Sequence, residues 1–359
     1  MRRYSTSLLI LNDSWWSMRE LSAHPYPSAY NTWLANATLT AKFHGARWAS
    51  GDYSRTVDNA IVYGQYEPWY GLRRLAEHLG GDAEIAAYAN AAESAWLPYT
   101  VKNSGRITGY YNYTDGFRLS GNQAARDALV VQSRSAAYAT GSSLEMMKAE
   151  ALSREVAYAV NGYVNAELCG APRHERLAPY IELMVGDGGH IDQWLGGIQA
   201  DAAGNIVAGT ESFHRFAEGK EGFAPFMGAI TSWSLFAAAK VLPLDNRIVP
   251  KLTRLFDAMW PFYWMPGGMK YRWVSTTAAT ALNNEMAPIY WRLYLETGMR
   301  RFLERGDALF NATASYESLT YRGTATQVYL SKEFNELIRW ACDGLRWRAE
   351  GVAKHGGIH

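Results

Sequence analysis

The chain has few cysteines, no long apolar run and no excess of charge of one sign. Cys169 and Cys342 are the only cysteines, so neither a disulfide framework nor a Cys/His zinc motif is expected. We interpret both as buried free thiols, with a single disulfide between them as the alternative. Lys plus Arg number 35 against 34 Asp plus Glu, which gives no general field to attract nucleic acid. No apolar run approaches the ~20 residues of a membrane span.

Signals for nucleotide-binding, metal-binding and strand-rich folds are also missing. The sequence contains neither G-x-G-x-x-G after a predicted strand nor a P-loop, and strand-like stretches are confined to 205–210 and 319–329. No pair of histidines has metal-binding spacing on a helix face together with a carboxylate. We therefore expect an all-α protein with no cofactor and no metal. The apolar stretch after Arg3 is too short to decide between a secreted or periplasmic and a cytoplasmic location.

Aromatic residues are abundant instead. The chain contains 14 Trp and 23 Tyr, and 48% of its residues are hydrophobic. Most of these rings are expected in the core. An excess of amphipathic rings is also typical of a sugar-binding cleft, because a flat ring covers the apolar face of a pyranose while its polar edge bonds hydroxyl groups.

Helical hairpins recur along the chain. An amphipathic helix over 71–80 stops at Gly80-Gly81, and Asp82 is predicted to cap the next helix. The same order returns where 290–298 ends at a glycine and is followed by a helix over 301–310. Longer polar, aromatic loops are predicted between hairpins at 100–123, 186–210 and 262–276.

This weak internal repeat predicts a barrel of helical hairpins. We expect an all-α (α/α)6–7 toroid with the long aromatic loops at one end, and a linear helical solenoid is the alternative. No linker or change of composition divides the chain. The prediction is one domain over 1–359, in which residues 1–30 are an N-terminal extension that packs on the barrel.

Four stretches carry a resemblance to known enzymes: Leu79-Gly-Gly-Asp82, Glu296-Thr-Gly298, and the aromatic loops 110–116 and 264–273. Together they resemble the carbohydrate-active α/α toroids, over about residues 30–345. Among these the chain is most similar to the toroid glucuronan and alginate lyases. The resemblance implies a polysaccharide as the partner and cleavage of a uronate-containing chain by β-elimination. It leaves the oligomeric state open.

In those lyases a loop that bears Glu and His precedes a catalytic tyrosine, as Glu211 and His214 precede Tyr271 here. Elimination requires that the substrate carboxylate be neutralised, that a base remove the C5 proton and that an acid protonate the leaving oxygen. A tyrosine can serve when nearby positive charge lowers its pKa from about 10. Tyr271 lies between Lys270 and Arg272, and is therefore the predicted base or acid.

The complete set of candidates follows from these loops and from the Gly-rich stretch 186–194. The predicted catalytic residues are Tyr271, Glu211, His214, His190 and Arg272. The predicted substrate-binding residues are Trp69, Tyr110, Tyr113, Asp115, Trp194, Arg215, Lys270, Trp273, Asn283 and Asn284.

Two alternatives stay open at this point. An inverting glycoside hydrolase needs one protonated and one ionised carboxyl group roughly 6.5–9.5 Å apart. Its candidate carboxyl groups are Glu67, Asp115, Asp187, Asp192, Glu211 and Glu285. A non-catalytic glycan-binding protein would keep the aromatic cleft and contain no residue on which turnover depends.

Overall fold

The structure is a computed structural model that describes residues 26–51, 66–102, 114–136, 144–149, 153–196, 199–200, 206–208, 223–272, 274–322 and 328–356. Helices dominate this part of the chain, which confirms the all-α prediction. None of its helices combines the length and the apolar character that crossing a bilayer requires.

The helices are listed here in chain order. They are α2 (Tyr30–Ser50), α4 (Pro68–His78), α5 (Ala83–Lys102), α6 (Asp115–Leu119), α7 (Gln123–Ala136), α8 (Leu144–Met147), α9 (Ser153–Leu168), α10 (Leu177–Val185), α11 (His190–Leu195), α13 (Pro225–Ala238), α14 (Ile248–Tyr263), α15 (Asn283–Thr297), α16 (Arg300–Thr313), α17 (Glu317–Thr320), α18 (Val328–Arg339) and α19 (Ala341–His355), with a 3-10 turn η3 (Thr280–Leu282). Two antiparallel strand pairs accompany them: β1 (Gln199–Ala200) with β2 (Ile206–Ala208), and β3 (Trp264–Met265) with β4 (Gly268–Met269).

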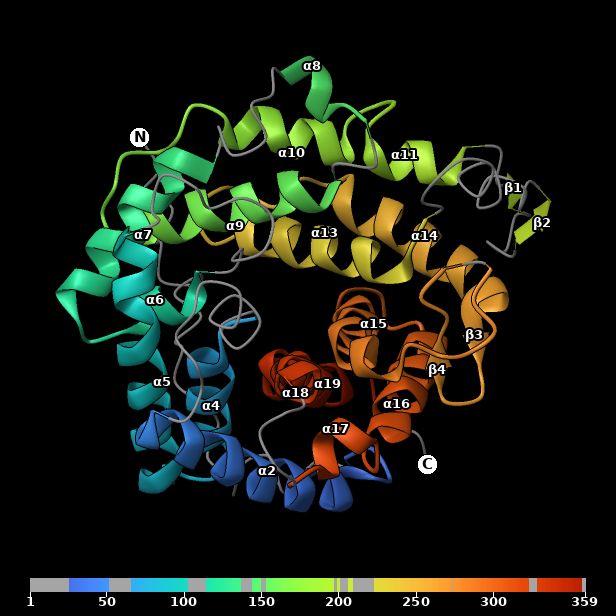
Figure 1. Ribbon diagram of the computed structural model, residues 1–359. Helices are drawn as coiled ribbons and strands as arrows, with labels where there is room; N and C mark the ends of the chain where they lie inside the picture. The colour runs from blue at the N-terminus through green and yellow to red at the C-terminus, as the bar shows by residue number, and fades with distance from the viewer. Residues whose placement is uncertain are drawn as a thin grey trace.

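Packing between helices follows the order of the chain and then returns to its beginning. Helix α5 packs on α2 and α4, α9 on α7 and α13, and α15 on α13, α16 and α19. The last helices, α18 and α19, contact α4, and α17 contacts α2. In Figure 1, α4, α9, α13, α15, α18 and α19 lie toward the middle, while α2, α5, α10 and α16 lie toward the periphery.

The predicted hairpin junctions are confirmed, and their geometry explains why they could be predicted from the sequence. Helix α4 ends before Gly80 and Gly81, whose φ angles of 77° and 93° favour glycine, and the Asp82 carboxylate accepts a hydrogen bond of 3.0 Å from the Ile85 N–H. Gly298, at φ 69°, ends α15 in the same left-handed conformation. Each junction depends on one local backbone geometry.

The expected loops and strands need correction. Within 186–210 the structure has helix α11, and most of the described part of 319–329 is helical, in α17 and α18. Only 205–210 contains the expected strand, β2. The stretch 262–276 contains the β3–β4 hairpin. Leu319 is buried on helix α17, so the apolar residues of this stretch did not indicate a strand.

The core is aromatic and closely packed. Trp33 lies between helices, with its ring 5.2 Å from Phe310, and Phe310 lies 5.5 Å from Trp291. All three are fully buried. The prediction that most Trp and Tyr residues serve the core agrees with this packing. Cys169 and Cys342 are free thiols, and only Cys342 is fully buried.

Candidate functional site

Tyr271 follows the β3–β4 hairpin. Gly267 and Gly268, at φ 96° and 139°, form the turn that no other residue type adopts easily. The side chain of Tyr271 is 40% exposed, and its ring stacks on Phe226 at the start of α13, with 5.1 Å between ring centroids. The hairpin therefore presents a phenol at the N-terminal end of α13.

One cation lies over the ring of Tyr271, and a second is within electrostatic range of it. The guanidinium carbon of Arg272 lies 5.3 Å from the ring centroid of Tyr271. Burial lowers the pKa of Lys332 on α18, but Glu336 raises it, and Tyr271 raises it to a smaller extent. The Lys332 Nζ lies 2.9 Å from Glu336 Oε1 and 5.6 Å from the ring centroid of Tyr66. The net effect raises the pKa of Lys332, which therefore stays an ammonium group.

Glu285, in the first turn of α15, is a buried carboxyl group whose side chain has no hydrogen-bond partner among the described residues. Its side chain is fully buried, and neither carboxyl oxygen has a hydrogen bond within the described part of the chain. Burial first, and then Glu336, raises its pKa well above the usual value. Glu285 is therefore a protonated acid. We call Tyr271, Arg272, Glu285, Lys332 and Glu336 the Tyr271 cluster.

A buried ion network lies beside this cluster. Arg339, at the end of α18, donates to Glu67 Oε2 at 2.6 Å and to Asp115 Oδ2 at 2.8 Å, and its side chain is 1% exposed. Tyr66 and Glu67 adopt φ angles of 65° and 48°, a left-handed conformation that costs free energy for residues other than glycine. The Gly116 N–H also donates to both Glu67 oxygens, at 3.1 and 3.2 Å. These bonds offset the strain and hold Glu67 against Arg339.

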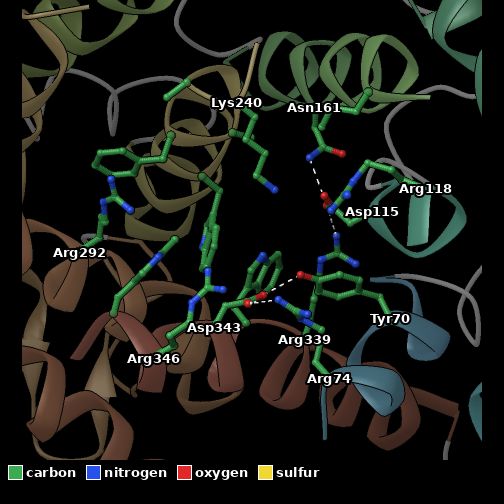
Figure 2. Close-up of a pocket in the computed structure, with 17 residues that line it drawn as sticks. Tyr70, Arg74, Asp115, Arg118, Asn161, Lys240, Arg292, Arg339, Asp343 and Arg346 are labelled. Carbon is green, nitrogen blue, oxygen red and sulfur yellow. Dashed lines mark hydrogen bonds and ion pairs between the residues drawn. The ribbon is translucent and has the colours of Figure 1, made fainter. Parts of the chain in front are cut away.

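Asp115 faces a different space from Tyr271. It lines a cavity of about 380 Å³ between α4, α6, α9, α13, α15, α18 and α19, which we call the cationic cavity (Figure 2). Neither Tyr271 nor any other member of its cluster lines this cavity. Trp233 and Trp340 do line it, and their rings stack with 5.9 Å between centroids. The indole N–H of Trp233 donates to the Glu285 carbonyl oxygen at 3.1 Å, so this stack stands between the two sites.

The ionisable groups of the cationic cavity are held by hydrogen bonds and by neighbouring charges. The Tyr70 hydroxyl donates to Asp343 Oδ2 at 2.6 Å, and burial together with Asp343 raises the pKa of Tyr70 well above its usual value. Burial acts to raise the pKa of Asp343, but Arg74 and Arg346 outweigh it and hold the pKa far below its usual value. For Asp115, burial acts to raise the pKa, but Arg339, Lys240 and Arg118 together outweigh it and lower the pKa. The phenol stays protonated and both carboxylates stay ionised, which leaves no poised base or acid.

Several predicted contacts prove to be core residues. His190 is buried, with Nε2 2.8 Å from the Met147 carbonyl oxygen. Trp69 and Trp194 are buried in the core as well. Burial lowers the pKa of His190, so its imidazole is neutral. These three side chains pack the fold, and we count them as core residues rather than as catalytic or substrate contacts.

The two predicted asparagines also serve the fold. The Asn283 amide donates to the Gly267 carbonyl oxygen at 3.1 Å, and its Oδ1 accepts from the Met269 N–H at 3.3 Å. Asn284 donates to the Leu337 carbonyl oxygen at 2.8 Å. Both are fully buried. Asn283 thus holds the hairpin that precedes Tyr271, a positioning role in place of the expected contact with sugar.

The remaining candidates divide between the surface and residues outside the description. Asp192 accepts from Lys251 at 2.7 Å and from the Gly188 N–H at 3.0 Å, and Asp187 lies 3.8 Å from Lys251, so both belong to a surface turn. Lys270 is half-buried and forms a backbone bridge with Ala278. The predicted residues that lie outside the described part of the chain are Glu211, His214, Arg215, Tyr110, Tyr113 and Trp273.

Sequence reasoning did not find Phe226, Lys332 or Glu336. Lys332 and Glu336 stand one helical turn apart in 328–339, a spacing that indicates an ion pair on one helix face. Such pairs are common on exposed helices, so the spacing alone does not point to a site. Glu285 was one of several hydrolase candidates, and it differs from the equally buried Glu67 in that neither of its carboxyl oxygens has a hydrogen bond within the described residues.

Comparison with known proteins adds no assignment. No protein-family model matches the chain, and neither the search of curated proteins nor the search of solved structures gave a match.

Proposed function

We propose that the protein is a polysaccharide lyase with an α/α-toroid fold that cleaves a uronate-containing polysaccharide, of the glucuronan or alginate type, by β-elimination. The fold part of the proposal is supported by the helical hairpins and by the contacts of α18 and α19 with α4, which bring the last helices back to the first. It is also supported by the chain order, in which the β3–β4 hairpin lies between α14 and α15 and is followed by η3.

The observation that carries the reaction is the setting of Tyr271. Its side chain is 40% exposed, the Arg272 guanidinium lies over its ring, and the Lys332 ammonium group on α18 is within electrostatic range. Cations near a phenol attract a substrate carboxylate to it and stabilise the negative charge that develops there in the transition state. A uronate lyase needs both effects in one place.

In the proposed reaction the phenol oxygen of Tyr271 acts as the base and removes the proton from C5 of the uronate. The electron pair left on C5 forms the double bond between C4 and C5, and the bond from C4 to the glycosidic oxygen breaks. The phenol then returns its proton to the leaving oxygen. Lys332 and Arg272 neutralise the carboxylate while negative charge moves onto it. Stacking of Tyr271 on Phe226 limits the rotation of the phenol during these transfers.

One observation favours a second candidate, an inverting glycoside hydrolase. Glu285 is a carboxyl group whose pKa is raised by burial, which is the state that a general acid requires. Glu336, paired with Lys332, would be the second carboxyl group. Glu285 is fully buried, however, and a general acid must reach the leaving oxygen, so we place this function second.

The products of the reaction distinguish the candidates. The protein is incubated with glucuronan, alginate, pectate and hyaluronan, and ultraviolet absorbance is followed beside new reducing ends. A lyase raises both signals, because elimination leaves an unsaturated sugar. New reducing ends without absorbance identify the hydrolase and contradict the lyase proposal. A protein that binds a polymer and leaves both signals flat is a glycan-binding protein.

A further inference from the structure

The cationic cavity is separate from the Tyr271 cluster and has a wall of consistent chemistry. Six cations line it: Arg74, Arg118, Lys240, Arg292, Arg339 and Arg346. Only two carboxylates, Asp115 and Asp343, stand against them in the lining. Figure 2 shows these side chains directed at one space from the surrounding helices.

The two carboxylates are already satisfied from within the protein. Asp343 accepts from Arg74 at 2.7 Å and from Tyr70 at 2.6 Å. Asp115 accepts from Arg339 at 2.8 Å, from Asn161 at 3.2 Å and, through its other oxygen, from Asn165 at 3.1 Å. Both carboxylates therefore have hydrogen bonds from within the protein, and the cations of the lining outnumber them by six to two.

Other cations of the wall keep hydrogen-bonding capacity. Arg292 and Arg346 pair with Glu296 at 2.5 Å and with Glu350 at 3.8 Å, and neither carboxylate lines the cavity. The Nε–H groups of both arginines are buried and have no acceptor within the described residues. Arg346 as a whole is 8% exposed. A buried guanidinium donor without an acceptor costs free energy, and a bound anion would remove that cost.

Aromatic rings complete the wall. Trp233 and Trp347 lie with their ring centroids 4.6 Å apart, and Phe236 lies 6.4 Å from Trp347. The Arg292 guanidinium carbon lies 4.9 Å from the Phe236 ring centroid, which holds the cation against the apolar surface. A wall of this kind suits a ligand that carries both an apolar ring face and an anionic group.

We propose that the cationic cavity is a second binding site, distinct from the reacting Tyr271 cluster, for a small acidic saccharide of one or two rings whose charge is a carboxylate or a sulfate. A volume of about 380 Å³ lies within the range of small-molecule pockets. The site binds without turning over its ligand, because its phenol is protonated and its carboxylates are ionised and bonded. The proposal does not depend on the lyase reaction.

Isothermal titration calorimetry of the full chain tests this site, with glucuronate and glucose 6-sulfate as probes. Neutral glucose and inorganic sulfate are the matched controls. We expect the acidic sugars to bind and each control to bind at least about tenfold more weakly. Glucose lacks the anionic group that the cations bind, and inorganic sulfate lacks the ring that packs on the aromatic side chains. Glucose binding as tightly as glucuronate would overturn the proposal, and so would inorganic sulfate matching glucose 6-sulfate, since the site would then be a general anion site.

Substitutions locate the binding. Lys240→Gln, at an exposed position on the cavity rim, and Arg292→Gln should each weaken binding of the acidic sugars about tenfold. Arg300→Gln, an exposed arginine on α16 outside the cavity, is the matched control and should leave binding unchanged. Tyr271→Phe should also leave this binding unchanged, whatever it does to turnover. If Arg292→Gln does not fold, Lys240→Gln carries the test, and unaltered affinity in Lys240→Gln contradicts the proposal.

Discussion

The indole rings of Trp233 and Trp340 stack with their centroids 5.9 Å apart, and this stack lies between the Tyr271 cluster and the cationic cavity. On one side, Trp233 donates to the carbonyl oxygen of Glu285. On the other side, both rings line the cationic cavity. Acidic and phenolic groups thus lie toward the N-terminal ends of α13 and α15, while the wall of arginines and aromatic rings lies beyond the stack.

Removing the phenol oxygen of Tyr271 tests the proposed reaction. Tyr271→Phe keeps the stacking on Phe226 and removes only the group that transfers the proton, so we expect kcat on the polyuronate that the protein cleaves to fall by roughly 10²–10⁴-fold. Tyr88→Phe, which loses a hydroxyl bonded to Glu84 at 3.0 Å on α5, is the control and should keep its activity. Equal activity of Tyr271→Phe and the unaltered protein excludes Tyr271 as the base.

Glu285 makes stability depend on pH in a direction that can be stated in advance. Its pKa in the folded protein is raised above the unfolded value, so its contribution to stability is complete below the unfolded pKa and is lost as pH rises toward the folded pKa. Each unit of that shift corresponds to about 1.4 kcal/mol. Glu285→Gln cannot ionise, so we expect the variant to gain stability relative to the unaltered protein between pH 5 and pH 8.

Urea unfolding of both proteins at the two pH values measures this difference. Glu336 also has a raised pKa and stays in both proteins, so its contribution cancels to first order in the comparison. A difference in unfolding free energy that is the same at both pH values would show that Glu285 does not bind its proton more tightly in the folded state.

Arg339 should be the most sensitive charge in the described interior. Arg339→Met leaves Glu67 and Asp115 buried without their shared cation, and breaking a buried ion pair from one side costs about 3–5 kcal/mol. Arg300→Met, on an exposed side chain paired with Glu304, should change the unfolding free energy little. Chemical denaturation compares the two variants, and similar losses in both would mean that the buried network does not stabilise the fold.

Alanine substitutions at two hairpin junctions distinguish the cost of a left-handed backbone from the cost of a steric contact. Gly80→Ala places a methyl group in open space at φ 77°, and Gly298→Ala places one 3.0 Å from His355 Nδ1 at φ 69°. Both variants should lose about 1–2 kcal/mol from the left-handed backbone. Gly298→Ala should lose more, because its neighbour must also move. Unfolding free energies in urea give the comparison, and a Gly80→Ala variant as stable as the unaltered protein would contradict the strain.

The sequence by itself determined the features of this protein that depend on a few neighbouring residues. Gly80-Gly81 and Gly298 predict helix ends, because only glycine adopts their backbone angles without strain. Asp82 predicts a helix start, because its carboxylate reaches an N–H three residues later. The recurrence of these signals predicted an all-α chain.

Only the tertiary structure decided which ionisable groups meet. Lys332 and Tyr271 are distant in sequence, and only the packing of helices brings their charges together. Packing also buries His190, Trp69 and Asn283, which resembled site residues because aromatic and polar residues near glycines occur in cores and in clefts alike. Burial and the approach of distant charges set the protonation of Glu285 and Asp115. Neither quantity is local, so residue spacing alone does not contain it.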